Sequence, residues 1–213
     1  MVNLVEYAAI KNNTSVANVT LVAVSKLKPL EDLQILYNQG QRHFGENYVQ
    51  ELVNKQATLP KDILWHFIGH LQSNKVKYIA PFVHLIQSVD SEKLLKEIDK
   101  QAAKNNRVIS VLLQIHIAKE ATKFGLDETE LFQIDTHKYS NIKIEGLMGM
   151  ATFTEDKEVV KKEFHYLQQL ATKYSIQKES LSTLSMGMSD DYSLAMQCGS
   201  NMVRIGSSIF GRR

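Results

Sequence analysis

The sequence has only one cysteine, Cys198, and only three prolines and ten glycines among its 213 residues. A single thiol cannot form an intrachain disulfide or the Cys/His cluster of a zinc finger, so we expect a reducing, cytoplasmic environment. The scarcity of proline and glycine, together with the lack of low-complexity tracts, argues against disorder and against flexible linkers. We therefore expect one folded domain over residues 1–213.

A strong excess of one charge and long hydrophobic runs are also lacking. Lysine and arginine number 25 against 23 for aspartate and glutamate, which leaves a formal net charge of only +2. Nucleic-acid and anionic-membrane partners favour a basic excess, so we expect neither. No uncharged run reaches the roughly 18 residues of a membrane-spanning helix. Glu6 lies where a secretion signal would be apolar, so we expect no targeting segment.

What is present is an alternation of short β-rich runs with longer amphipathic stretches, the pattern of βα units. Helices are predicted near Val2–Lys11 and over Pro29–Gln39, Ser91–Asn105 and Glu155–Tyr174. The predicted strands are Thr20–Ser25, His43–Gly45, Trp65–Ile68, Leu85–Val89, Val108–Ile117, Ile142–Met150, Leu181–Met186 and Met202–Ile205. This pattern predicts an α/β fold, a single (β/α)8 TIM-type barrel with an extra N-terminal helix. Its functional residues should lie where strands end and helices begin.

Lys26 directly follows the apolar run LVAVS, so its side chain is predicted to lie near the barrel mouth. Desolvation there would lower the pKa of the lysine and make a neutral amine available for imine formation. The alternative is a lysine that caps the strand and extends its charge into solvent. From position alone, the second arrangement is the commoner one.

Two strand-to-turn junctions rich in glycine and serine follow each other near the C-terminus. Ser189 precedes an apolar-periodic run, so it is predicted to cap a helix whose free amides would attract an anion. Gly206 and Ser207 follow the last strand, where backbone amides and a hydroxyl could bind a phosphate. The alternatives are that Ser189 only caps a helix and that Gly206 only makes a turn.

Three further residues have less decisive positions. Arg204 shares a strand face with Gly206, so it is predicted inside the barrel, where it pairs with a core carboxylate or donates to a ligand. Asn47 contacts a ligand, or Glu46 and Asn47 together start a helix. His66 lies between two aromatic residues and is predicted to be a core histidine. No spacing of His, Asp or Glu predicts a metal site.

Six sequence blocks in a fixed order carry a further indication. They are LVAVSKLKP, HFGENYVQEL, WHFIGHLQSNK, KEATKFGL, EGLMGMAT and LSMGMSDDYSLAMQCGSNMVRIGSSIFG. These blocks resemble the signatures of the pyridoxal phosphate homeostasis proteins, and the resemblance runs from about Leu21 to Gly211. It implies a barrel similar to the N-terminal domain of bacterial alanine racemase, without that enzyme's second domain. It also implies the cofactor pyridoxal 5′-phosphate.

The resemblance assigns a role to each candidate residue. Lys26 would be the Schiff-base lysine, and Arg204 would face the pyridine nitrogen. Asn47 would line the site near the cofactor ring. The residues that would bind the phosphate are Ser189, Gly206 and Ser207.

The function implied is intracellular homeostasis of pyridoxal phosphate, by buffering or delivering the cofactor with little or no catalysis. A guanidinium facing the ring nitrogen cannot accept its proton, which disfavours racemase-like chemistry. We therefore expect a carrier without catalytic residues that makes transient contact with apo-enzymes. Because a small closed barrel has no obvious unpaired strand edge, we also expect a monomer. The alternatives are a pyridoxal-phosphate-dependent amino-acid racemase or lyase, and a cofactor-free barrel enzyme in which Lys26 forms an imine with a sugar phosphate.

Overall fold

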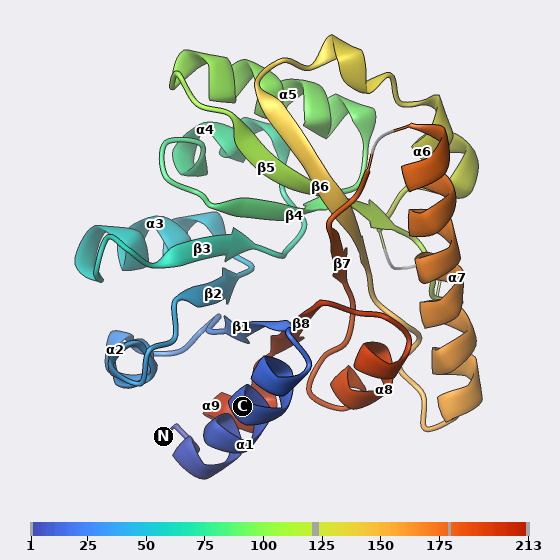
Figure 1. Cartoon of the computed structure of the whole chain (residues 1–213). Helices are drawn as coiled ribbons and strands as arrows, with labels where there is room; N and C mark the ends of the chain where they lie inside the picture. Colours follow the sequence, from blue (N-terminus) through green and yellow to red (C-terminus); the bar gives the residue numbers. More distant parts are fainter. Residues whose placement is uncertain (1, 121–123, 179, 212–213) are drawn as a thin grey trace.

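Figure 1 shows the computed structural model, which describes residues 2–120, 124–178 and 180–211. Within these ranges, eight parallel strands close into a barrel in sequence order, with β8 paired to β1. The strands are β1 (Thr20–Val24), β2 (His43–Glu46), β3 (Leu64–Phe67), β4 (Leu85–Val89), β5 (Ile109–Ile115), β6 (Ile142–Gly149), β7 (Thr183–Ser185) and β8 (Met202–Ile205). The predicted (β/α)8 barrel is therefore confirmed. Part of the KEATKFGL block, residues 121–123, lies outside the described residues.

Helices surround the barrel on its outer side (Figure 1). They are α1 (Leu4–Val16), α2 (Leu30–Asn38), α3 (Val49–Thr58), α4 (Val76–Ile79), α5 (Glu92–Lys104), α6 (Glu128–Gln133), α7 (Lys157–Gln177), α8 (Tyr192–Gln197) and α9 (Ser207–Phe210), with 3₁₀ turns η1 (Ser73–Lys75) and η2 (Thr136–Lys138). The predicted N-terminal helix is confirmed as α1. It packs beside α9, and the Asn3 amide donates to the Ile209 carbonyl at 2.8 Å. The first and last helices of the described residues therefore lie side by side (Figure 1).

Short polar side chains mark where several helices begin. The Ser91 hydroxyl accepts from the Leu94 amide at the start of α5. Asp127 and Glu130 form a reciprocal capping box at the start of α6. Such caps bind amides that the first helical turn leaves without partners, and each contributes about 1 kcal/mol.

The buried hydrophobic residues form two clusters, one between the barrel and its helices and one inside the barrel. The larger cluster fills the space between strands and helices and includes Leu33, Phe164 and Leu167, each fully buried. The smaller one lies within the barrel and consists of Val22, Leu85, Leu112, Met148 and Met202. The interior also holds buried polar side chains, namely His66, Gln87, Ser185 and Arg204. The barrel is thus a packed core that contains a polar strip.

Membrane crossing requires a long helix with few charges. The longest helix among the described residues is α7, with 21 residues, and charged side chains such as Lys161, Lys162 and Glu163 interrupt it. Nowhere in the described part of the chain does a helix combine the length and the hydropathy needed to span a bilayer.

Candidate functional site

The predicted site residues come from four neighbouring strands. Lys26 follows β1, Asn47 follows β2, Ser189 follows β7, and β8 carries Arg204 and is followed by Gly206 and Ser207. The order β7, β8, β1, β2 is continuous around the barrel, so these residues lie on one arc of it. All six are at or near the carboxyl ends of the strands, the end at which such barrels carry their sites.

The turn that carries Lys26 is anchored by a buried ion pair. Glu46 is fully buried, and its Oε1 accepts from the Ser25 hydroxyl at 2.6 Å and from Lys55 Nζ at 2.8 Å. The Lys55 ammonium also donates to the Ser25 carbonyl at 2.7 Å. Burial raises the pKa of the Glu46 carboxyl, and the nearby Lys55 charge opposes that rise. Sequence reasoning missed this pair, because it joins the end of β2 to the last turn of α3.

A second carboxylate, that of Glu51 on α3, also holds this turn. Leu27 has a left-handed backbone with φ of 59°, which is uncommon for a residue with a branched side chain. Its amide donates to Glu51 Oε1 at 2.6 Å, and that oxygen also accepts from Lys55 at 2.6 Å. The backbone around Lys26 is therefore fixed by charged groups on α3.

Ser189 binds the amides that follow β8. Its hydroxyl oxygen accepts from the amides of Gly206 and Ser208, each at 3.4 Å. The predicted helix cap at Ser189 is wrong, because α8 begins at Tyr192 after Asp191, whose carboxylate accepts from the Met188 amide instead. Ser208 was not predicted, and no sequence signal distinguished it from the exposed Ser207.

Gly206 lies directly against β1. A Cβ atom at this position would come within 3.2 Å of the Val24 carbonyl oxygen and 3.3 Å of the Val24 Cβ. Because this spacing is tighter than ordinary contact, the missing side chain lets β8 pair closely with β1. The register agrees, since Val22 lies opposite Arg204 and Ala23 opposite Ile205.

Arg204 is buried inside the barrel, as predicted, with 4% of its surface exposed. Its guanidinium donates to the Ser185 hydroxyl at 2.6 Å and to the Gly149 carbonyl at 3.0 Å. Burial lowers the pKa of Arg204 to about 10, and the Asp191 carboxylate opposes that fall. The group therefore stays protonated at neutral pH and acts only as a donor.

A chain of hydrogen bonds runs from Arg204 through the barrel interior. The Ser185 hydroxyl donates to Gln87 Oε1 at 2.7 Å, and Gln87 Nε2 lies 2.9 Å from His66 Nδ1. His66 Nε2 lies 2.9 Å from His43 Nδ1. Because a guanidinium can only donate, the Ser185 proton must point to Gln87, and each later proton then points away from Arg204. His66 therefore carries its proton on Nε2.

The chain of hydrogen bonds ends in a cluster of three histidines, two of which lie at the amino ends of their strands, opposite the mouth. His43 opens β2, His66 lies in β3 and His84 precedes β4. Their ring centroids are 5.1, 5.4 and 5.9 Å apart. His66 is a buried core histidine with both ring nitrogens bonded, as predicted. The sequence spacing did not reveal the cluster, because barrel closure brings distant residues together.

Asn47 does not start a helix, since α3 begins at Val49 after Tyr48. The Asn47 Oδ1 atom is buried and lacks a hydrogen-bond partner in the described structure. Gly69 packs against it so tightly that a Cβ at that glycine would lie 2.5 Å from the Asn47 carbonyl oxygen. A buried amide oxygen without a partner costs free energy, so it marks a position where a ligand donor would be favourable.

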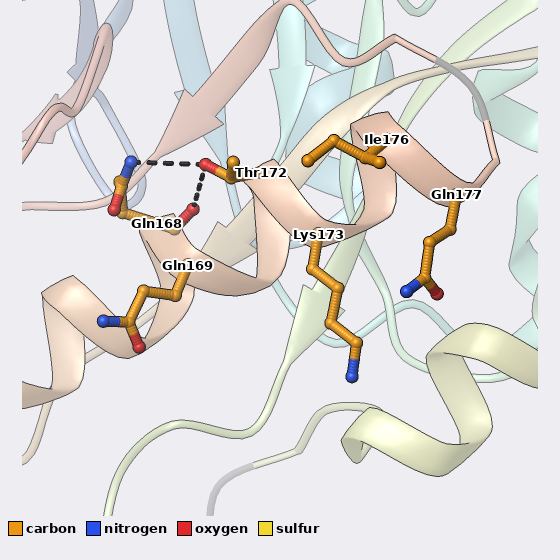
Figure 2. Close-up of a pocket in the computed structure, with 6 residues that line it drawn as sticks. All are labelled: Gln168, Gln169, Thr172, Lys173, Ile176 and Gln177. Atoms are coloured by element: carbon orange, nitrogen blue, oxygen red, sulfur yellow. Dashed lines mark hydrogen bonds between the residues drawn. The ribbon is translucent and has the colours of Figure 1, made fainter.

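Two hollows differ in their relation to the strand ends. A cavity of about 800 Å³ lies between the loop after β6, including Ala151 and Thr152, and the loop after β7, including Met188 and Asp191. A shallower hollow of about 370 Å³ lies on the outer face of α7, and Figure 2 shows its side chains projecting from that helix alone. No strand end contributes to the described lining of the second hollow. The first hollow lies beside strand ends, but none of the six predicted residues is among its described lining residues. We place the candidate site at the mouth because the six residues lie at or near the carboxyl ends of neighbouring strands.

These features define a class: TIM-type barrel proteins whose candidate site lies at the carboxyl ends of the strands. A family model described as the N-terminal domain of alanine racemase matches residues 5–213, and the chain belongs to that family. The predicted likeness to the N-terminal domain of alanine racemase is thereby confirmed.

Similar proteins confirm the resemblance to the pyridoxal phosphate homeostasis proteins. The pyridoxal phosphate homeostasis protein of Pasteurella multocida is 39% identical over 204 residues, covering 92% of this chain and 87% of the relative. PipY of Synechococcus elongatus has been solved without pyridoxal phosphate at 34% identity and a TM-score of 0.89, covering 97% of this chain and 98% of PipY. PipY has also been solved with that cofactor bound, at 35% identity and a TM-score of 0.83, covering 91% and 93%.

Proposed function

We propose that this protein binds pyridoxal 5′-phosphate at the barrel mouth and serves its intracellular homeostasis, by buffering or delivering it. The observation that carries the proposal is the convergence of the Gly206 and Ser208 amides on the Ser189 hydroxyl. The two amides directly follow β8, which pairs with β1, the strand that precedes Lys26. Amides that converge at a strand end are a common way to bind phosphate. PipY, solved with this cofactor bound, supports the choice of ligand.

The residues present fit the cofactor. Lys26 Nζ would attack its aldehyde carbon with loss of water and so hold it as a Schiff base. Ser189, Gly206 and Ser207 would bind the phosphate, and the partnerless Asn47 Oδ1 would accept a hydrogen bond from the ligand side of the site. Arg204 would face the pyridine nitrogen from its buried position.

Little or no catalysis is proposed, because of what Arg204 can and cannot do. Pyridoxal phosphate supplies an electron sink when its ring nitrogen carries a proton. Arg204, with a pKa of about 10, keeps its own proton and cannot accept that one. We therefore propose a carrier that releases the cofactor to apo-enzymes when another amine displaces Lys26. We also propose that this carrier is cytoplasmic, single-domain and monomeric.

The test is an absorption spectrum of the purified protein loaded with pyridoxal phosphate, before and after borohydride reduction, followed by peptide mapping. Borohydride reduces a lysine C=N bond to a stable amine, so we expect the visible band to disappear and the added mass to map to Lys26. A mass that maps to a different lysine, or no band with saturating cofactor, would contradict the proposed site.

The carrier role is tested separately from binding. The loaded protein is incubated in D₂O with a panel of amino acids, and exchange of the α-hydrogen is followed by NMR. We expect no sustained exchange above that given by free pyridoxal phosphate. Turnover that depends on Lys26 would contradict the carrier role and would support the alternative from the sequence, a racemase or lyase.

A further inference from the structure

We propose that His43, His66 and His84 form a binding site for a divalent transition metal, with zinc as the favoured ion, at the amino end of the barrel. Each histidine offers one ring nitrogen, and these three nitrogens lie within 4.8 Å of one another. Zinc bound tetrahedrally at about 2.0–2.1 Å needs ligand nitrogens roughly 3.3 Å apart. Small side-chain movements would therefore suffice to place the three nitrogens around one ion.

The surroundings of the cluster allow an ion to enter from solvent. His66 is fully buried, His43 is half-buried and His84 is exposed. The site is thus closed on the barrel side and open on the solvent side, where water would complete a three-histidine set. The Glu145 carboxylate acts electrostatically on His84 and would favour a cation, whereas Arg107 acts in the opposite sense.

Burial of the cluster also favours the neutral form of the three rings. Burial lowers the pKa of His43 to about 4 and that of His66 well below its usual value, and the neighbouring histidines lower both further. Burial lowers the pKa of His84 as well. Neutral imidazole is the form that binds metals, so protons compete weakly for these nitrogens at neutral pH.

The hydrogen-bond chain sets the internal cost of binding. His66 would bind metal through Nε2, because its Nδ1 faces Gln87. A neutral ring that binds through Nε2 carries its proton on Nδ1, where the Gln87 amide now presents a donor. Metal binding therefore requires the Gln87 amide to turn, so that its oxygen accepts from His66 and its nitrogen donates to Ser185. The Ser185 proton then loses Gln87 Oε1 as its acceptor, which adds to the cost. A carbonyl or carboxylate behind a metal-bound histidine is the usual arrangement.

This requirement gives the proposal a test with opposite signs. Zinc binding is measured by competition with a chromophoric chelator, using the native protein and the variants His84→Ala, His165→Ala and Gln87→Glu. His84 is exposed, so its removal leaves the core intact. His165 is the matched control, because it is also exposed and lies 3.8 Å from the thiol of Cys198, a competing pair of zinc ligands.

We expect one zinc ion per native chain, and a tetrahedral cobalt spectrum when Co²⁺ replaces zinc. His84→Ala should weaken binding at least about tenfold, and His165→Ala should leave it unchanged. Gln87→Glu should tighten binding about tenfold or more, because a carboxylate accepts from His66 without having to turn. Equal affinity in His84→Ala and the native protein, loss in His165→Ala, or no saturable binding would overturn the proposal.

Discussion

Replacing Lys26 with alanine is expected to remove the covalent attachment of pyridoxal 5′-phosphate and with it the visible absorbance of the loaded protein. The Lys26 amine is the only part of the proposed site that would form a covalent bond to the cofactor. Its removal leaves only noncovalent contacts to hold the cofactor. We expect affinity to fall by two orders of magnitude or more, measured by fluorescence titration, because a reversible covalent bond is replaced by solvent.

The matched control is Lys93→Ala on α5, an exposed lysine that follows Ser91 and Glu92 at the start of that helix. This variant should bind and absorb like the native protein. Lys26→Arg keeps the positive charge without a nucleophilic amine, and it should behave like the alanine variant. Retention of the visible band in either Lys26 variant would show that a different lysine holds the cofactor.

Replacing Lys55 with methionine is expected to lower the free energy of unfolding by about 3–5 kcal/mol. The change leaves the Glu46 carboxylate buried without its charged partner, and it removes the donor that holds the Ser25 carbonyl. Urea unfolding followed by circular dichroism measures the loss. The deficit should shrink at acid pH, because Glu46, whose pKa burial already raises, is then protonated and neutral in the folded state.

The control for this prediction is an ion pair at the surface. Lys173 and Glu128 lie 2.6 Å apart, and their side chains are 49% and 40% exposed. Lys173→Met should change stability by no more than about 1 kcal/mol, because solvent screens the pair. The double variant Lys55→Met with Glu46→Gln should recover part of the loss. Equal losses of unfolding free energy in Lys55→Met and Lys173→Met would contradict the description of Glu46 and Lys55 as a buried ion pair that stabilises the fold.

The barrel could be predicted from sequence because it depends on local signals. Runs such as LVAV are apolar on both faces and lie between amphipathic stretches, which is what parallel strands covered by helices require. The same logic placed Arg204 in the interior, since it shares a strand face with Gly206. Strand boundaries differ from the structure by at most a few residues at each end.

The contacts that hold the site could not be predicted, because they join residues far apart in sequence. Glu46 and Lys55 belong to different elements, and nothing local marks them as a pair. The Ser189 prediction failed by two residues, since Asp191 precedes α8 while Ser189 turns toward the amides after β8. The three histidines come from separate βα units, so only closure of the barrel reveals them.

The hydrogen-bond chain from Arg204 to His43 has a consequence for how this barrel can evolve. Each member is buried or half-buried, and the proton of each link points in a direction set by the link before it. An apolar replacement at Gln87 would remove the hydrogen-bond partner of both the Ser185 hydroxyl and the His66 ring. A substitution at one of these positions is therefore expected to be removed by selection, unless a second substitution within the hydrogen-bond chain accompanies it. The residues of this hydrogen-bond chain should be inherited together, as coupled positions spread over five strands of the barrel.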